Sequence, residues 1–170
     1  MSGIGSQVNA GAQLYTKAQR ERRDSTVWTT VQGVLAPIQF LVFLISLTLI
    51  IRYFLTGDGY ILATFSIVLK TIILLSIMVT GAIWEKVVFG QYLLAPAFFW
   101  EDVVSFFVIG SHLFYLTLLF SEMLSNDTKM WVALFAYSLY LINAAQFLLK
   151  LRAARLSSRP SPEPRRGVIV

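Results

Sequence analysis

The apolar positions of this chain gather into four long runs separated by short polar stretches. The runs cover about residues 28–51, 60–83, 103–120 and 130–149. Each is close to the 17 to 25 residues that a helix needs to cross ~30 Å of hydrocarbon. The pattern therefore predicts an all-α fold, an integral membrane four-helix bundle.

Composition supports this interpretation and excludes several kinds of protein. The 170 residues are 56% hydrophobic and only 14% charged, whereas about a quarter of an ordinary soluble domain is charged. The absence of cysteine excludes disulfides, iron–sulfur clusters and thiolate chemistry. Neither GxGxxG, GxxxxGK[ST] nor HExxH occurs, so nucleotide and zinc sites are disfavoured. No room remains for a separate soluble catalytic domain.

Basic residues flank the first and last apolar runs and are scarce in the turns that face the other side. They are Lys17, Arg20, Arg22 and Arg23 before the first run, and Lys150, Arg152, Arg155, Arg159, Arg165 and Arg166 after the last. Because positive charge is retained on the cytoplasmic side, both termini are predicted to be cytoplasmic. The net charge of +5 then reflects orientation, and no nucleic-acid partner is expected. The expected parts are a cytoplasmic N-terminal tail (1–24), a four-span membrane domain (25–151) and a disordered cytoplasmic tail (152–170).

One uncharged segment, residues 87–100, does not fit the pattern of spans. It lies between Glu85-Lys86 and Glu101-Asp102, and as a helix it would be only about 21 Å long. A fifth crossing would also place one basic tail outside. We therefore expect an interfacial or re-entrant segment between the second and third helices, on the cytoplasmic side, and the sequence leaves open whether it dips into the bilayer or lies flat.

Three carboxylates border this segment, and aromatic residues accompany them. Glu85 stands beside Trp84, and Glu101 and Asp102 follow Trp100. Carboxylates next to aromatic surface lose hydration, which favours the protonated acid, and two carboxyl groups in different environments can divide acid and base roles. The alternative is that these residues only mark where helices leave the membrane.

The third apolar run carries a polar stripe that ends at the only histidine. Glu101, Ser105, Val108, His112 and Tyr115 are spaced 4, 3, 4 and 3 apart, which places them on one face of a helix. His112 lies about 16 Å deeper than Glu101. It is either a ligand or hydrogen-bond donor to a bound pigment or a packing histidine bonded to another helix. A single histidine excludes a bis-histidine haem site.

Two other runs contain polar residues at membrane depth. Lys70 lies near the middle of the second run, and we expect it to snorkel toward the outer headgroups rather than to pair with a substrate carboxylate. Tyr140, Asn143, Gln146 and Lys150 share one face of the fourth helix. There Asn and Gln are expected to form interhelical hydrogen bonds.

The sequence around the carboxylates closely resembles the 3-vinyl bacteriochlorophyllide hydratase family. The resemblance rests on WEKVVFGQYLLAPAFFWEDVVS, on ERRDSTVWTTVQGVLAPIQFLVFLISL and on INAAQFLLKLRAARL, and it covers about residues 20–156. It implies a cofactor-independent hydro-lyase that adds water to the C3 vinyl group of chlorophyllide a or a related bacteriochlorophyllide. The product is a 1-hydroxyethyl group that a later dehydrogenase oxidises. It also implies a bacterial inner membrane, cytoplasmic or intracytoplasmic photosynthetic.

Residue roles follow as hypotheses from the chemistry of that reaction. Glu85 or Glu101 would act as general acid, and the other, with Asp102, as base or water-orienting group. The macrocycle would stack on Trp84, Tyr92, Phe98, Phe99 and Trp100. His112 or a water would ligate the magnesium, which belongs to the substrate, so no metal of the protein's own is expected. Lys86, Arg23 or Arg22 would pair with the propionate.

Two functions of other classes stay open at this stage. The first is a non-enzymatic membrane protein for pigment binding or assembly, in which His112 binds magnesium and the carboxylates are structural. The second is a small transporter with Lys70 and His112 as an intramembrane relay. The expected partners are the pigment, the lipid bilayer and the following dehydrogenase, and the oligomeric state is not determined by the sequence.

Overall fold

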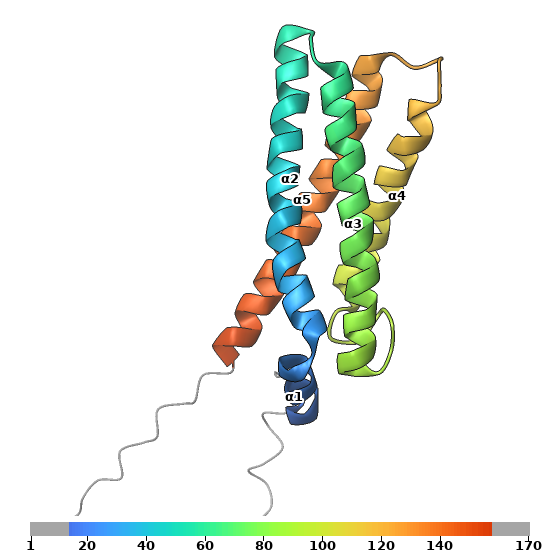
Figure 1. Cartoon of the computed structure of the whole chain (residues 1–170). Coiled ribbons are helices and arrows are strands. Elements are labelled where there is room, and N and C mark those ends of the chain that lie inside the picture. Colours follow the sequence, from blue (N-terminus) through green and yellow to red (C-terminus); the bar gives the residue numbers. More distant parts are fainter. Residues whose placement is uncertain (1–13, 158–170) are drawn as a thin grey trace, which may run out of the picture.

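In the part of the chain that the structure describes, all regular secondary structure is helical. A computed structural model describes residues 14–157. Its helices are α1 (Lys17–Ser25), α2 (Val27–Thr56), α3 (Tyr60–Phe89), α4 (Phe99–Leu119) and α5 (Asn126–Ser157) (Figure 1). By length and composition, α2 to α5 are each able to cross a membrane. The predicted all-α fold with four apolar helices of spanning length is confirmed.

The helices continue beyond the apolar runs that predicted them. Helix α3 extends through Phe89 and ends at Gly90, whose φ of 89° is the left-handed conformation that commonly closes a helix. Hydropathy detects only the hydrocarbon crossing, whereas a helix continues until a capping residue stops it. As a result, Glu85 lies in the last turns of α3, and Glu101 and Asp102 lie in the first turn of α4.

Parts of both predicted tails are helical. Helix α1 was not predicted, because its nine residues contain no apolar run. It begins with a capping box in which Thr16 and Gln19 each bind the other's backbone N–H. Helix α5 continues through Ser157, so residues 152–157 differ from the predicted disorder. The remaining disorder predictions, for Met1–Ala12 and from residue 158 onward, lie outside the described residues.

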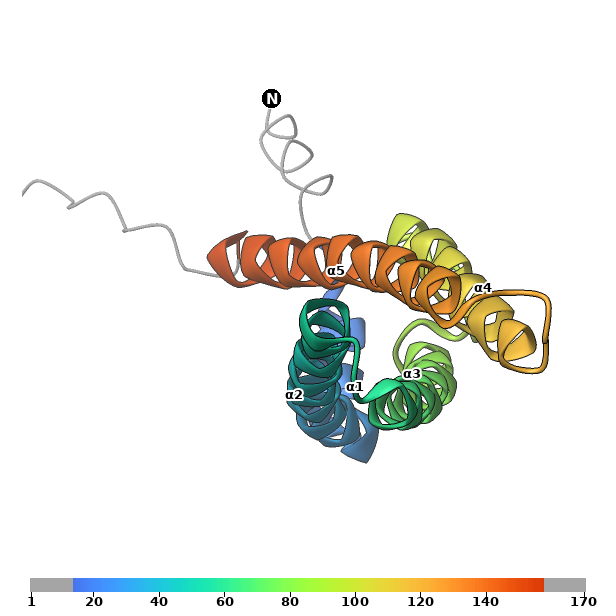
Figure 2. The same ribbon diagram turned by 90° about the horizontal axis from the view of Figure 1, so that it is seen from above.

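The four long helices pack mainly in two pairs. Helix α2 packs most extensively against α3, and α4 against α5. Seen from above, α2 and α3 lie side by side while α5 runs along one side of this pair and meets α4 (Figure 2). Residues 90–98 join α3 to α4 at the same end of the bundle as α1 (Figure 1). We call this end the loop end, and the candidate site lies there.

Candidate active site

The three predicted carboxylates come together at the loop end. Glu85 comes from α3, and Glu101 and Asp102 from α4. All three are buried, with 5%, 7% and 3% of their surface exposed. Buried carboxyl groups require partners, because an unpaired one loses its hydration without compensation. We call these three residues the carboxyl cluster.

The loop between α3 and α4 covers the carboxyl cluster and binds it through its backbone. The N–H of Leu94 donates to Asp102 Oδ2 at 2.7 Å, and the N–H of Ala95 donates to Glu85 Oε2 at 3.3 Å. Leu94 adopts a positive φ of 59°, which is uncommon for a residue with a side chain. The strained conformation of Leu94 thus accompanies a loop geometry in which two consecutive N–H groups point at the carboxyl groups.

Within the cluster, Glu85 and Asp102 form a pair. Their carboxyl oxygens accept from the N–H groups of the consecutive residues Ala95 and Leu94, which brings the two acids together between α3 and α4. Two neighbouring buried carboxyl groups repel each other when both are ionised, which favours a proton on one of them. This pair, which we call the dyad, can therefore supply both a proton donor and a proton acceptor.

Glu101 has a different partner. Its Oε2 accepts from Nζ of Lys150 on α5, and the two form a salt bridge. Its backbone carbonyl accepts from Ser105 Oγ at 2.8 Å and from Asn143 Nδ2 at 2.9 Å. The predicted interhelical role of Asn143 is confirmed. Sequence reasoning did not assign Ser105, Asn143 or Lys150 to the site, although all three lay on the polar faces that it identified.

Two of the five predicted ring walls belong to an aromatic cluster beside the carboxyl groups. The cluster consists of Tyr15, Trp84, Phe89, Phe98 and Phe147. Phe98 is at its centre, with its ring centroid 5.7 Å from that of Trp84 and 5.9 Å from that of Phe147. Tyr15, which sequence reasoning missed, stacks on Phe89 at 5.8 Å, and burial raises the pKa of its phenol. The rings contact one another, so the cluster is closed in this structure.

The other three predicted walls lie at the surface. Tyr92, Phe99 and Trp100 are 60%, 41% and 67% exposed, and none is part of the aromatic cluster. Phe99 and Trp100 contact each other edge to face at 5.4 Å. These rings surround the loop and do not enclose the carboxyl cluster.

The two predicted cations for the propionate also lie at the loop end. The guanidinium of Arg23 lies 4.8 Å from the centre of the Tyr15 ring and forms a salt bridge with Asp24. Lys86 donates to the carbonyl of Gly90 at 2.8 Å, and its Nζ lies 5.2 Å from the centre of the Tyr92 ring. Both cations therefore lie near aromatic rings, and in the described part of the chain neither forms a salt bridge with the three carboxyl groups.

The polar stripe predicted on α4 is confirmed, but His112, near its far end, contacts residues other than the carboxyl cluster. Every member of the stripe is buried. The Nε2 of His112 lies 2.7 Å from Nζ of Lys70, and its Nδ1 lies 2.7 Å from the carbonyl of Val108. Both ring nitrogens thus have partners within the bundle. Binding of the substrate magnesium by His112 stays a prediction.

Lys70 corrects one expectation. It does not snorkel toward the headgroups: none of its surface is exposed, and its Nζ lies 4.0 Å from the centre of the Tyr140 ring. The reason is the neighbouring α4, which supplies His112 as an acceptor at the same depth. Nearby, Ser46 Oγ bonds both Ser66 Oγ and the Tyr137 hydroxyl. We call Lys70, His112, Ser46, Ser66 and Tyr137 the lysine–histidine cluster.

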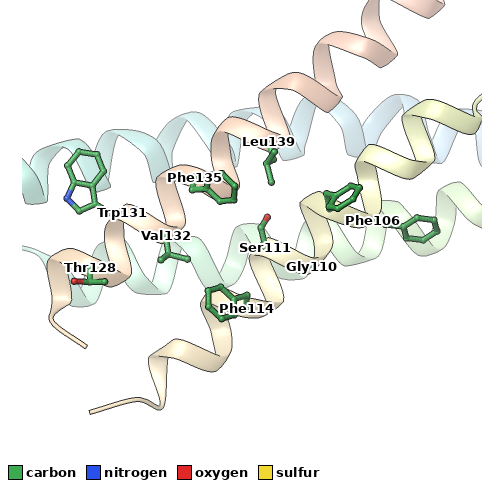
Figure 3. Close-up of a pocket in the computed structure, with 10 residues that line it drawn as sticks. Phe106, Gly110, Ser111, Phe114, Thr128, Trp131, Val132, Phe135 and Leu139 are labelled. Carbon is green, nitrogen blue, oxygen red and sulfur yellow. The ribbon is translucent and has the colours of Figure 1, made fainter. Parts of the chain in front are cut away.

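An apolar groove of about 670 Å³ lies elsewhere, between α4 and α5 (Figure 3). Aromatic side chains that line it are Phe106, Phe107, Phe114, Trp131 and Phe135. Its α4 residues lie between the buried positions of that helix, on the face that turns away from the carboxyl cluster. No acidic or basic side chain lines the groove, so it offers no group for proton transfer.

Comparison with known proteins identifies the family. Residues 15–153 match the 2-vinyl bacteriochlorophyllide hydratase family. This family name counts the vinyl-bearing position as 2, whereas the numbering used above counts it as 3. A protein of Cereibacter sphaeroides with that name is 63% identical over 144 residues, covering 85% of this chain and 89% of the relative. One of Rhodobacter capsulatus, also so named, is 61% identical over 145 residues, covering 85% and 84%. No solved structure matches the chain. The chain therefore belongs to the 2-vinyl bacteriochlorophyllide hydratase family.

Proposed function

We propose that this protein adds water to the vinyl group of a bacteriochlorophyllide or chlorophyllide and forms the 1-hydroxyethyl derivative. The observation that carries the proposal is the buried dyad of Glu85 and Asp102, whose carboxyl groups accept from consecutive N–H groups of one loop. Alkene hydration needs both a proton donor and a proton acceptor, and the dyad contains both. Membership of the hydratase family supports the same reaction.

The reaction begins with proton transfer to carbon. The Glu85 carboxyl group gives its proton to the terminal vinyl carbon, and the π electrons of the double bond form the new C–H bond. The positive charge left on the inner carbon spreads into the conjugated macrocycle. Buried carboxylates nearby stabilise that charge electrostatically.

Water then completes the addition. Its oxygen attacks the inner carbon, and its proton passes to the Asp102 carboxylate. Proton transfer between the two neighbouring carboxyl groups then returns that proton to Glu85, so one water has been added and the dyad is restored. No cofactor takes part in this scheme, and magnesium enters only as part of the substrate.

The proposal gives Glu101 a role different from that of the dyad. Because Lys150 forms a salt bridge with its carboxylate, we assign Glu101 the role of a negative charge rather than that of a proton donor. Of the two residues that the sequence suggests as general acid, Glu85 and Glu101, we therefore propose Glu85.

Substrate access requires movement at the loop end. The N–H groups of Leu94 and Ala95 occupy the two carboxyl groups that would meet the vinyl group and water. We propose that residues 90–98 move away to admit the substrate, and that Trp84 and Phe98 then stack on the macrocycle. Gly90 and Leu94, both at positive φ, are the positions in this loop where the backbone direction changes most sharply.

The remaining substrate contacts are proposed from charge. Arg23 and Lys86 are the cations that we assign to the propionate. Tyr92, Phe99 and Trp100, exposed around the loop, are assigned to the first contact with the macrocycle as it arrives from the bilayer. His112 is a magnesium ligand only if it exchanges one of its present partners for the metal.

We also propose the setting in which the reaction occurs. The protein would lie in a bacterial inner membrane, cytoplasmic or intracytoplasmic, with both termini and the loop end on the cytoplasmic side. Basic residues near both termini support this orientation. An amphiphilic pigment collects at the membrane surface, so the product could be passed there to the following dehydrogenase.

An isotope experiment tests the function. The purified protein in lipid nanodiscs is given a vinyl chlorophyllide in ¹⁸O-labelled water, and the pigment is analysed by mass spectrometry. The hydratase is expected to incorporate one labelled oxygen into each product molecule. Pigment that is retained without label would instead support the binding or assembly protein. Pigment moved across a vesicle membrane without label would support the transporter.

A further inference from the structure

The carboxyl cluster contains three acids, and a single basic side chain binds it in the described part of the chain. Lys150 forms a salt bridge with Glu101, although the two residues are 49 positions apart in the sequence. Buried carboxylates repel one another, so in such a group the protons are distributed according to which charges are compensated. The position of Lys150 therefore bears on which residue holds the reactive proton.

Lys150 is held firmly in its place. Its side chain is only 25% exposed, and its Nζ lies 5.2 Å from the centre of the buried Phe98 ring. About two turns away on the same face of α5, Asn143 donates to the backbone carbonyl of Glu101. Helix α5 thus binds Glu101 twice, at the carboxylate and at the backbone, and this fixes the direction of the Glu101 side chain.

Two other basic residues at the loop end have partners of their own. On α3, Lys86 donates to the carbonyl of Gly90. Before α2, Arg23 pairs with Asp24 and stacks on Tyr15. The basic residue of α2, Arg52, lies at the opposite end of the bundle, and the loop contributes backbone N–H groups alone. Lys150 is therefore the cation that faces the carboxyl cluster.

We propose that Lys150 is a positioning residue for the hydration: it keeps Glu101 ionised and confines the mobile proton to Glu85 and Asp102. This inference rests on the proposed function, in which the dyad transfers that proton. Without the ammonium group, the Glu101 carboxylate would be buried and uncompensated. It would then compete for the proton and make the surroundings of the dyad more negative.

The sign of the expected change follows from charge. A more negative cluster holds its proton more tightly, so both limbs of the pH–rate profile move to higher pH. Lys150→Met is therefore expected to shift the profile upward by about one pH unit and to lower the rate at neutral pH. Glu101→Gln, which leaves the ammonium uncompensated, is expected to shift it to lower pH.

The experiment compares pH–rate profiles in nanodiscs for the unchanged protein, Lys150→Met, Lys150→Arg, Glu101→Gln and the double variant Glu101→Gln/Lys150→Met. Lys150→Arg keeps the charge and is expected to keep the midpoint. The double variant removes both charges and is expected to return the midpoint toward its original value. If Lys150→Met lowers the rate without moving the midpoint, Lys150 is only structural and the proposal is wrong. If that variant does not fold, the direction of the Glu101→Gln shift decides.

A second readout does not depend on turnover. Infrared titration of the carboxyl C=O band follows protonation directly in each variant. An upward shift of that titration in Lys150→Met, in a protein that hydrates no vinyl pigment, would refute the proposed function while supporting the effect of Lys150. Hydration with an unmoved titration would refute the Lys150 proposal alone.

Discussion

Two buried polar clusters lie in this bundle, and they differ in what covers them. The carboxyl cluster lies where α3 ends and α4 begins, under a short loop whose backbone N–H groups bind the acids. The lysine–histidine cluster lies in the middle of the helices, where side chains supply the partners. A loop can move without unfolding the bundle, whereas four packed helices cannot separate so easily. A buried ionisable group is therefore a stronger candidate for a catalytic role where a loop covers it than where packed helices enclose it.

The largest effect is expected at the dyad. Glu85→Gln keeps the shape of the side chain but removes the acid, so the hydration rate should fall by about 10² to 10⁴. Asp102→Asn should cause a loss of similar size. The measurement is product formation by the purified variants, compared at equal amounts of folded protein.

The matched control for the dyad is Glu122→Gln, which changes an exposed acid at the opposite end of the bundle. It should leave the rate unchanged. Near-normal turnover in both dyad variants would show that neither residue transfers the proton. The carboxyl cluster could then no longer be distinguished from the lysine–histidine cluster by a catalytic role.

The next effect should appear as stability in the other cluster. His112→Phe keeps the bulk but leaves the buried Lys70 amine without its acceptor, so unfolding should become easier by about 1 to 3 kcal/mol. Thermal unfolding in detergent measures this. The double variant Lys70→Met/His112→Phe removes the amine as well and should recover most of the loss.

A different result for His112 would change the interpretation of the lysine–histidine cluster. If His112→Phe unfolds normally but changes the absorption spectrum of bound pigment, the histidine contacts the magnesium, and the lysine–histidine cluster belongs to the substrate site. The spectrum is recorded with the same preparation that is used for unfolding.

A smaller effect is expected in the loop. Proline at position 94 removes the N–H that binds Asp102 and cannot adopt a positive φ, so Leu94→Pro should lower the rate about tenfold or more. Leu94→Gly keeps the N–H and fits the left-handed conformation, so it serves as the control and should retain activity. Equal rates for the two variants would mean that the loop does not organise the acids.

The smallest effect is expected in the α4–α5 groove. Phe107 and Trp131 are 66% and 62% exposed and lie away from the acids, so replacing either by alanine should change the rate by less than about twofold. A tenfold loss would indicate that the macrocycle binds in the groove rather than at the loop end. Initial rates at saturating pigment are sufficient to decide this.

The sequence by itself determined the features that depend on local pattern. Apolar runs of spanning length predicted the four long helices, and spacings of three and four placed Glu101 and His112 on one buried face of α4. The exceptional stretch around Glu85 and Asp102 was visible because charges are scarce nearby. Helix periodicity and hydropathy are properties of neighbouring residues, so they can be read without knowing how the helices pack.

Only the tertiary structure decided which distant residues meet. Packing of α3 against α4 gave Lys70 a partner in His112, where the sequence alone predicted snorkelling. Packing of α5 against α4 joined Lys150 to Glu101 and so separated one acid from the dyad of Glu85 and Asp102. Such pairs depend on the relative rotation and depth of whole helices. No local spacing encodes that geometry, because it results from the packing of all the side chains between them.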